Sequence, residues 1–225
     1  MTKFNDFRTV NNWQIERQKK FRHTPKQGIT INYLEKEFTV FKNVFWPFTD
    51  SQVLTKNMKV NPGDSILDVG TGSGVLAIFA ANKGAGQVLA VDINPNAVKC
   101  AKVNVKKHGF KDIIEVRLSD VYENIKNNEK FDLILANLPC RDKKASDLVE
   151  ASMWDTNLHA HKALISGAKK HLKEDGKIYL VNANFGPINK IKKIVRDNGL
   201  KIEKISEHKL NVNSGEVFYL FCIKP

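Results

Sequence analysis

Cysteine is scarce in this chain, which has three in 225 residues, at positions 100, 140 and 222. Their odd number, their wide spacing and the lack of a Cys-x-x-Cys pair argue against a disulfide framework and against a zinc site. His159 and His161 are too close in sequence to share one side of a helix, and His159 with Lys162 is typical of a polar stripe. We therefore expect no metal, and a reducing compartment, the cytoplasm, as the location.

Long hydrophobic runs are missing as well. The longest strongly apolar stretch, "VLAIFAA" (75–81), is far below the roughly 20 residues that span a bilayer. The first residues, "MTKFNDFRTV", lack the basic and then apolar pattern of an export signal. These observations predict a soluble, unexported protein with no membrane partner.

Acidic residues are in deficit, with 24 against 36 basic residues and a net charge of +12. Residues 1–60 carry 11 basic and 5 acidic side chains, residues 61–140 carry 9 of each, and residues 141–225 carry 16 and 10. A neutral middle between basic flanks fits a small-molecule site bordered by surfaces that face RNA or a ribosome. A lysine-rich solvated surface explains the pattern equally well, since arginine is the better phosphate ligand.

Strand-like and helix-like segments alternate from about Leu54 onward. The expected strands are 65–70, 87–93, 113–120, 131–139, 176–184, 201–210 and 216–223, and the expected helices are 74–84, 94–109, 156–172 and 188–199. Strands joined by such helices pair in parallel through right-handed crossovers. This predicts a doubly wound α/β sheet in one domain at 44–225, after a basic N-terminal extension at 1–43. The last two strands, joined by a turn at 211–216, are expected to pair antiparallel.

The first expected strand ends in a glycine-rich loop, "LDVGTGSGVLA" (67–77). In such sheets ligands bind at the C-terminal ends of the strands, and glycines let the backbone turn sharply beside a ligand. The frame Gly72-x-Gly74-x-x-Ala77 formally satisfies the dinucleotide fingerprint. Asp68 argues against a diphosphate there, because a carboxylate repels it. S-adenosylmethionine suits an acidic loop better, because it carries a sulfonium and an ammonium and has no phosphate.

Two further aspartates follow at the ends of the next expected strands. Asp92 lies 18 residues after Gly74, the distance at which a carboxylate accepts hydrogen bonds from ribose hydroxyls. Asp120 ends the third strand, within reach of the amine of a purine. Either residue alone is most often a helix or turn cap. Three acidic strand ends beside a glycine loop favour a ligand site.

The fourth expected strand ends abruptly in "FDLILANLPC" (131–140). A planar amide or amine nitrogen is a poor nucleophile unless it is aligned and its N–H groups are satisfied. The Asn137 side-chain carbonyl and the Leu138 backbone carbonyl can accept both N–H groups of one –NH₂. Pro139 restricts Leu138 to extended geometry and removes a competing donor.

These segments together resemble the class I S-adenosylmethionine-dependent methyltransferases. Over about 45–225 the chain is most similar to the small-domain type, which includes release-factor glutamine and ribosomal-RNA guanine amine methyltransferases. Two segments support this similarity: "VFWPFTDSQVL" (44–54) and "LISGAKKHLKEDGKIYLVNANF" (164–185). The resemblance implies a Rossmann-like sheet of strand order 3-2-1-4-5-7-6 with the last strand antiparallel, and S-adenosylmethionine as cofactor. It implies cofactor binding by Asp68, Gly70, Thr71, Gly72, Gly74, Asp92, Ile93, Asp120, Val121 and Asn137, acceptor orientation by Asn137, Leu138 and Pro139, and acceptor contacts from Phe45, Trp46, Phe48, Cys140 and Trp154.

The "NLPC" segment departs from the Asn-Pro-Pro-aromatic pattern of these families, because Leu138 replaces a proline and Cys140 replaces the aromatic residue. Transfer to an amino or amide nitrogen is the favoured prediction. Cys140 after Pro139 keeps open covalent catalysis by a thiolate on a pyrimidine carbon. RNA ranks first as acceptor, a protein glutamine second and a metabolite third, and the rival class is a nucleotide-binding or RNA-binding protein that transfers no methyl group.

Overall fold

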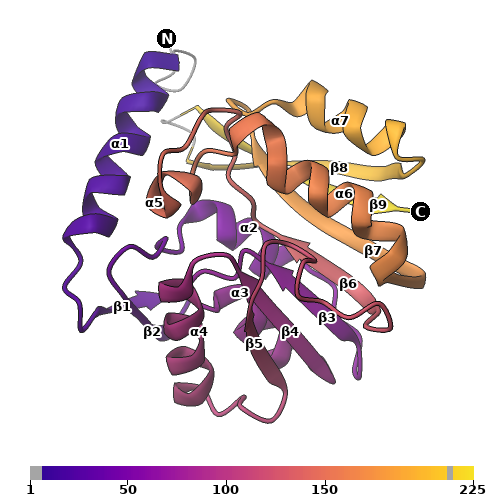
Figure 1. Ribbon diagram of the computed structural model, residues 1–225, viewed down its shortest axis with the longest axis horizontal. Coiled ribbons are helices and arrows are strands. Elements are labelled where there is room, and N and C mark those ends of the chain that lie inside the picture. The colour runs from indigo at the N-terminus through magenta and orange to yellow at the C-terminus, as the bar shows by residue number, and fades with distance from the viewer. Residues whose placement is uncertain (1–6, 212–214) are drawn as a thin grey trace.

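The computed structural model describes residues 7–211 and 215–225, and its centre is a seven-stranded sheet (Figure 1). Across the sheet the strands lie in the order β5-β4-β3-β6-β7-β9-β8. They are β3 (Ser65–Val69), β4 (Gln87–Asp92), β5 (Ile114–Leu118), β6 (Phe131–Ala136), β7 (Leu172–Ala183), β8 (Lys201–Asn211) and β9 (Glu216–Lys224). Counted along the chain this is the order 3-2-1-4-5-7-6, with only β9 antiparallel to its neighbours. The predicted sheet is confirmed; residues 212–214 of the expected turn lie outside the described residues.

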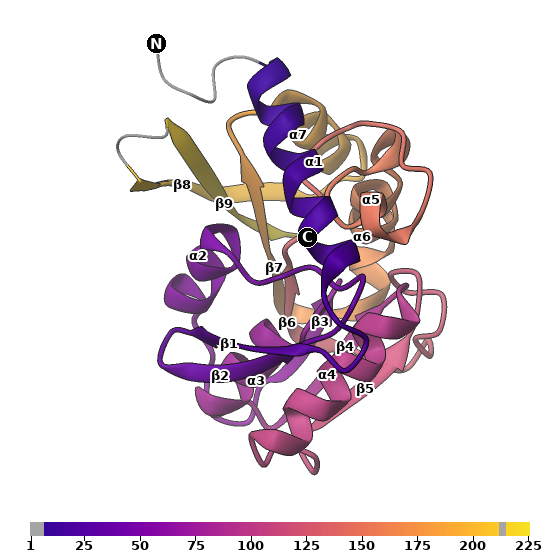
Figure 2. The ribbon, with the colours of Figure 1, turned by 90° about the vertical axis from the view of Figure 1, so that its left-hand side faces the viewer.

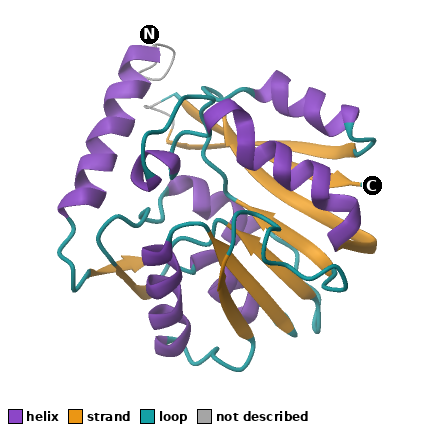
Figure 3. Ribbon diagram, in the orientation of Figure 1, coloured by secondary structure: helices purple, strands orange, loops and turns teal. Residues whose placement is uncertain are grey.

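Helices cover both faces of the sheet (Figure 3). They are α1 (Phe7–His23), α2 (Thr49–Asn57), α3 (Val75–Asn82), α4 (Pro95–Lys107), α5 (Leu148–Ala151), α6 (His159–His171) and α7 (Ile188–Asp197), with a 3-10 turn η1 (Thr156–Leu158). Within the described residues, no helix combines the length and apolarity needed to cross a membrane. Pro95 opens α4, and Asn94 caps it by accepting a hydrogen bond from the Asn96 N–H.

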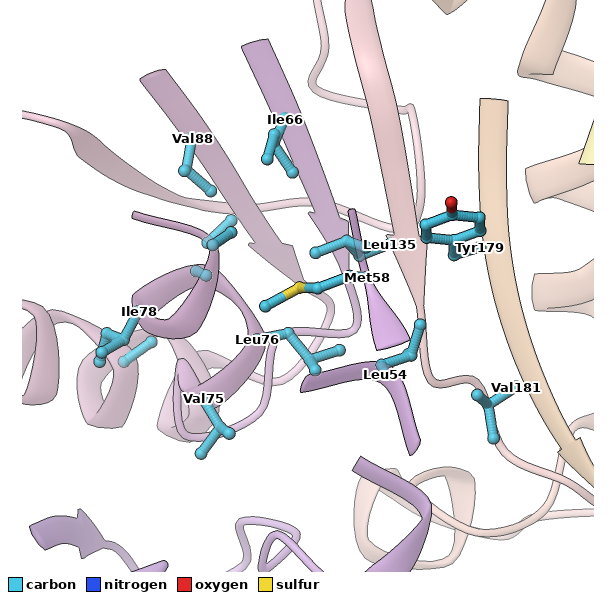
Figure 4. Packing of buried hydrophobic residues seen from close by; sticks show 14 of the residues in the cluster. Leu54, Met58, Ile66, Val75, Leu76, Ile78, Val88, Leu135, Tyr179 and Val181 are labelled. Atoms are coloured by element: carbon cyan, nitrogen blue, oxygen red, sulfur yellow. The ribbon is translucent and has the colours of Figure 1, made fainter. Parts of the chain in front are cut away.

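Alternate residues of each central strand enter different cores, as the two-residue period of a strand requires. Ile66 of β3 and Leu135 of β6 pack on one face in the same core as Leu54 of α2 and Leu76 of α3 (Figure 4). Their neighbours in the sequence, Leu67 of β3 and Ile134 of β6, pack with α6 and α7 on the other face. Because both faces of these strands are buried, their sequences are continuous apolar runs.

The N-terminal segment is folded onto the domain through α1 and a hairpin of β1 (Ile29–Tyr33) and β2 (Lys36–Val40). Val10 of α1 and Phe38 of β2 are fully buried in the core shared with α3. The sequence pattern did not predict this hairpin or α2. Its turn residues, Leu34 and Glu35, both have positive φ (47° and 64°), without the glycine or asparagine that normally signals such a turn.

A buried polar anchor fixes the start of α6. The Asp155 carboxylate accepts hydrogen bonds from the backbone N–H of Ala160 and His161 (3.0 and 3.1 Å) and pairs with His161 Nδ1 at 2.7 Å. The other ring nitrogen of His161 contacts the Asn182 amide of β7 at 3.2 Å. Burial opposes ionisation of Asp155, but the hydrogen bonds from His161 and the α6 backbone hold its pKa below the usual value.

Asp155→Ala should lower the free energy of unfolding by about 3 kcal/mol, because it leaves a buried histidine and two helix N–H groups without their acceptor. Urea titration at pH 7 measures this. Asp142→Ala, which removes only an exposed pair with Lys190, is the matched control and should change stability by less than about 1 kcal/mol. Equal effects of the two variants would contradict a structural role for the Asp155 anchor.

Candidate active site

A cavity of about 310 Å³ lies at the C-terminal ends of β3, β4, β5 and β6. Parallel α/β sheets bind ligands at this edge. Most of the residues expected at the site line this cavity: Phe45, Phe48, Gly70, Thr71, Gly72, Asp92, Ile93, Asp120, Val121, Asn137, Leu138, Pro139, Cys140 and Trp154. Three others, Asp68, Gly74 and Trp46, lie behind its walls instead. The structure therefore brings together residues that are up to about a hundred positions apart in the sequence.

The glycine loop between β3 and α3 is held tightly against β4. The backbone N–H groups of Gly70 and Thr71 both donate to the Val91 carbonyl at 2.9 Å, and the Gly72 N–H donates to Asp92 Oδ2 at 2.8 Å. Gly74 has φ of +85°, and a Cβ there would lie 3.3 Å from Ala101 of α4. The loop thus needs glycine at position 74 for both its backbone angle and its close approach to α4.

Asp68 is fully buried behind the loop, whereas its charge was expected on the rim of the site. Its Oδ2 accepts hydrogen bonds from Thr71 Oγ1 (2.6 Å) and the Ala77 N–H (3.1 Å), so it fastens the loop to the first turn of α3. Its other oxygen, Oδ1, is buried with no hydrogen-bond partner in the described part of the chain. Burial raises the pKa of Asp68 to about 7.

The raised pKa of Asp68 makes a pH-dependent prediction. The folded protein holds a proton on Asp68 that the unfolded chain loses near pH 4, so stability should fall as pH rises from about 4 to 7. Asp68→Asn removes this titration. From pH 4.5 to pH 8, the free energy of unfolding of wild type should fall by roughly 2–4 kcal/mol more than that of Asp68→Asn.

Urea titrations of the ligand-free protein at the two pH values measure this difference. Asp112→Asn, at an exposed aspartate, is the control and should leave the difference near zero. If the stability of Asp68→Asn depended on pH in the same way as that of wild type, Asp68 would be ionised in the folded protein throughout this range.

Asp92 and Asp120 line the cavity at the glycine-loop end. Besides Gly72, the Asp92 carboxylate accepts a hydrogen bond from the Asn94 N–H at 2.8 Å, and burial raises its pKa. Asp120 Oδ2 lies 2.8 Å from His159 Nε2, and both residues line the cavity. His159, interpreted from the sequence as part of a polar stripe, thus faces the site from the start of α6.

Asn137 leaves β6 at the centre of the cavity. Its Nδ2 donates to Ser51 Oγ at 3.1 Å, and its amide also contacts the Asp50 carboxylate; both partners belong to the first turn of α2. These partners hold the amide nitrogen toward α2, which leaves Oδ1 to accept a hydrogen bond from a ligand. Asp50 itself accepts from the Ser51 N–H at 2.8 Å, and burial raises its pKa.

Cys140 lies beside these groups but is poorly suited to nucleophilic attack. Burial raises the pKa of its thiol to about 12, and its Sγ is 3.6 Å from the Gln14 amide. A thiol with such a pKa is almost wholly protonated near neutral pH, whereas covalent catalysis needs the thiolate. The geometry therefore gives no support to the pyrimidine-carbon alternative.

Helix α1 contributes a wall of the cavity that was not predicted from the sequence. Trp13 and Arg17 of α1 line the cavity together with Asp50, Asn182 and Phe185. Trp154 Nε1 donates to Gln14 Oε1 at 2.7 Å, which ties α1 to the segment after α5. Trp13, Arg17 and the buried Phe21 are spaced four residues apart, so they lie on one inward-facing side of α1. This spacing is the sequence signal that could have predicted the wall.

The charges around the cavity suit a cationic cofactor. Asp92 and Asp120 face the glycine-loop end, and among the described lining residues that end has no lysine or arginine. A dinucleotide would need its diphosphate compensated there, whereas the sulfonium and ammonium of S-adenosylmethionine gain from nearby carboxylates. No group of three or more potential metal ligands occurs among the described residues.

Comparisons with known proteins place the chain among methyltransferases. A family model described as methyltransferase small domain matches residues 49–209. The ribosomal protein L11 methyltransferase of Lactobacillus johnsonii is 37% identical over 139 residues, 62% of this chain and 38% of that protein. Its Bacillus cereus counterpart is 45% identical over 92 residues, 41% of this chain and 29% of that protein. The chain thus spans less than two fifths of the length of these curated relatives.

Solved structures share the fold at low identity. The ribosomal protein L11 methylase from Lactobacillus delbrueckii subsp. bulgaricus has a TM-score of 0.62 and 24% identity, and the match covers 80% of both chains. The M. jannaschii tRNA m1G37 methyltransferase has a TM-score of 0.66 and 22% identity, and the match covers 88% of this chain and 57% of that one. At these identities the likeness supports the fold alone.

Proposed function

The chain belongs to the methyltransferase small domain family, whose members are S-adenosylmethionine-dependent methyltransferases, and from that premise we propose that it methylates an amino or amide nitrogen held at Asn137. The observation that carries the choice of nitrogen is the fixed Asn137 amide in the cavity wall. Its nitrogen is engaged by Ser51 and Asp50, so its carbonyl oxygen is the atom available to an acceptor N–H.

The cofactor would bind along the glycine loop and the ends of β4 and β5. Asp92 would accept hydrogen bonds from ribose hydroxyls while it also holds Gly72 in place. Asp120 would accept from the adenine amine, with His159 fixing the carboxylate from its other side. The exposed side chain of Ile93, on the cavity wall, would cover the adenine ring. The other residues proposed to bind the cofactor are Gly70, Thr71, Gly72 and Gly74 of the glycine loop, with Asp68 behind the loop and Val121 beside Asp120.

The chain's own groups would prepare the acceptor nitrogen for attack. Asn137 Oδ1 and the backbone carbonyl of Leu138 accept its N–H groups, so that the lone pair points along the line of transfer. Pro139 would help to aim the Leu138 carbonyl at the acceptor, because it restricts the residue before it to extended geometry. When bound, S-adenosylmethionine supplies the methyl group.

Aromatic rings supply the stacking surface that Cys140 does not provide. Phe45 and Phe48 line the cavity with ring centroids 5.5 Å apart, and the buried Trp154, in the same hydrophobic cluster, lines it too. These three rings would hold a planar or apolar acceptor beside Asn137. Trp46 does not line the cavity and packs against a small hydrophobic cluster behind the cavity wall.

Methyl transfer can be tested before the acceptor is known. The protein is incubated with methyl-labelled S-adenosylmethionine and a cell lysate, and the labelled product is hydrolysed to identify the atom that received the methyl group. RNA, a protein amide and a metabolite each offer a suitable nitrogen, and treatment with RNase or protease separates the first two. N-methyl label is the expected result; label on carbon or oxygen, or no transfer, would overturn the proposal.

A further inference from the structure

The guanidinium group of Arg17 lacks a complete set of partners. It lies over the Phe48 ring at 3.6 Å and over the Trp13 ring at 4.1 Å, and it lines the cavity. Its Nη1 is buried and has no hydrogen-bond partner in the part of the chain that the structure describes. A buried charged donor without an acceptor is costly, so this one indicates a ligand that supplies the acceptor.

The two rings prepare Arg17 to bind a planar anion. Stacking on Phe48 and Trp13 fixes the plane of the guanidinium, whose Nη1 has no hydrogen-bond partner among the described residues. A carboxylate accepts two parallel hydrogen bonds from such an edge. Gln14, one turn before Arg17, holds this part of α1 in place through Trp154.

The charges near Arg17 favour a monoanion over a dianion. Burial lowers the pKa of Arg17, and the carboxylates of Asp50 and Glu216 act in the opposite direction. Both acids lie near the anion position, and they would repel a dianion about twice as strongly as a carboxylate. The site therefore suits a monoanion such as a carboxylate better than a phosphate monoester.

The opposite end of the same compartment suits a nitrogen. Asp50 is an electrostatic neighbour of Arg17 and also contacts the Asn137 amide, so it joins the anion position to the proposed methyl-acceptor position. Around both positions the cavity is lined mainly by aromatic rings: Trp13, Phe45, Phe48, Trp154, Phe185 and Phe218. A ligand with an apolar body, a carboxylate at one end and a nitrogen at the other fits this lining.

The roof over the compartment favours a small ligand. Figure 2 shows α1 in front of the sheet and next to α5. Besides the bond to Gln14, Arg22 of α1 pairs with Asp147 at 2.8 Å, and the Asn43 N–H donates to the Phe21 carbonyl at 2.9 Å. A polymer would have to displace α1 and break these contacts to reach Arg17, whereas a small molecule would not.

We propose that the methyl acceptor is a small amino or amido carboxylic acid, with its carboxylate bound by Arg17 and its nitrogen held at Asn137. The inference rests on the proposed methyl transfer. As the nitrogen–carbon bond forms, the methyl carbon–sulfur bond breaks and sulfur keeps the electron pair as the neutral thioether of S-adenosylhomocysteine. The methylated nitrogen then loses one proton to water.

Binding of two isosteric probes tests the carboxylate position. Benzoate and benzamide are titrated against the protein by ligand-observed NMR, with and without S-adenosylhomocysteine. Wild type should bind benzoate at least tenfold more tightly than benzamide, and Arg17→Gln should abolish this preference. Arg22→Gln, on the same helix but paired with Asp147, is the matched control and should keep it. No preference in wild type, no binding of either probe, or a preference that survives Arg17→Gln would overturn the inference.

The second arm separates this inference from the proposed function. After incubation with methyl-labelled S-adenosylmethionine and lysate, the products are split at 3 kDa and the small fraction is passed over an anion exchanger at a pH above the pKa of an amine, where amino and amido carboxylic acids are both anions. N-methyl label in a retained small product, formed with a raised KM by Arg17→Gln, supports the inference. N-methyl label confined to RNA or protein overturns it and leaves the proposed function intact, while absence of any N-methyl label is the failure of the proposed function itself.

Discussion

Replacing Asn137 with alanine is expected to lower methyl transfer by at least 10²–10³-fold while the affinity for S-adenosylhomocysteine changes by less than about threefold. Its carbonyl oxygen is proposed to accept an acceptor N–H when the nitrogen attacks, so most of the loss should fall on kcat. The amide is held by Ser51 and Asp50, which belong to α2 and do not form the glycine loop. Its removal should therefore leave the cofactor end of the cavity unchanged.

Labelled methyl transfer and calorimetric titration with S-adenosylhomocysteine, run on the same preparations, measure the two quantities. Ser51→Ala should show a smaller loss of about tenfold, because it frees the Asn137 amide without removing its oxygen. Asn184→Ala, at a half-buried asparagine of the β7–α7 connection, is the control and should retain activity. A parallel loss of turnover and cofactor affinity in Asn137→Ala would make the residue structural.

Replacing Asp92 with alanine should weaken S-adenosylhomocysteine binding by about 100-fold or more. The carboxylate has two functions, because it would bind the ribose and it also accepts the Gly72 N–H of the glycine loop at 2.8 Å. Charged hydrogen-bond acceptors typically contribute about 1.5–3 kcal/mol each, and this variant loses both contributions.

Asp92→Asn helps to separate the two functions. Its one carbonyl oxygen can still accept the Gly72 N–H, so the loop should keep its shape while ribose binding weakens by about tenfold. Calorimetry gives the affinities, and amide hydrogen exchange of the glycine loop shows whether its backbone is intact. Unchanged affinity in Asp92→Ala would contradict the assignment of the ribose site.

The fold was predictable where one pattern dominated. The runs at 65–69, 87–92 and 131–136 are apolar because both faces of these strands are covered, and the glycines after α3, α4 and α7 mark helix ends. Most site residues followed from the same reasoning, since strand ends of a parallel sheet meet at one edge. Gly70, Gly72, Asp92, Asp120 and Asn137 therefore share one cavity.

The parts that escaped prediction depend on contacts between distant segments. The hairpin at 29–40 has a turn of Leu34 and Glu35, residues that carry no turn signal. The role of Asp68 could not be inferred either, because its position at the end of β3 fits both a charged rim and a buried anchor. The place of Arg17 follows from the packing of α1 through Gln14 on Trp154, 140 positions away.

Calorimetric titration of one preparation with S-adenosylhomocysteine and with NAD shows whether the cavity binds a methyl donor or a dinucleotide. Asp92 and Asp120 at the glycine loop, with no lysine or arginine among the described lining residues of that end, should attract a cationic methyl donor and disfavour a diphosphate. We expect saturable heat with S-adenosylhomocysteine and none with NAD. Binding of NAD at this cavity in place of S-adenosylhomocysteine would contradict this expectation.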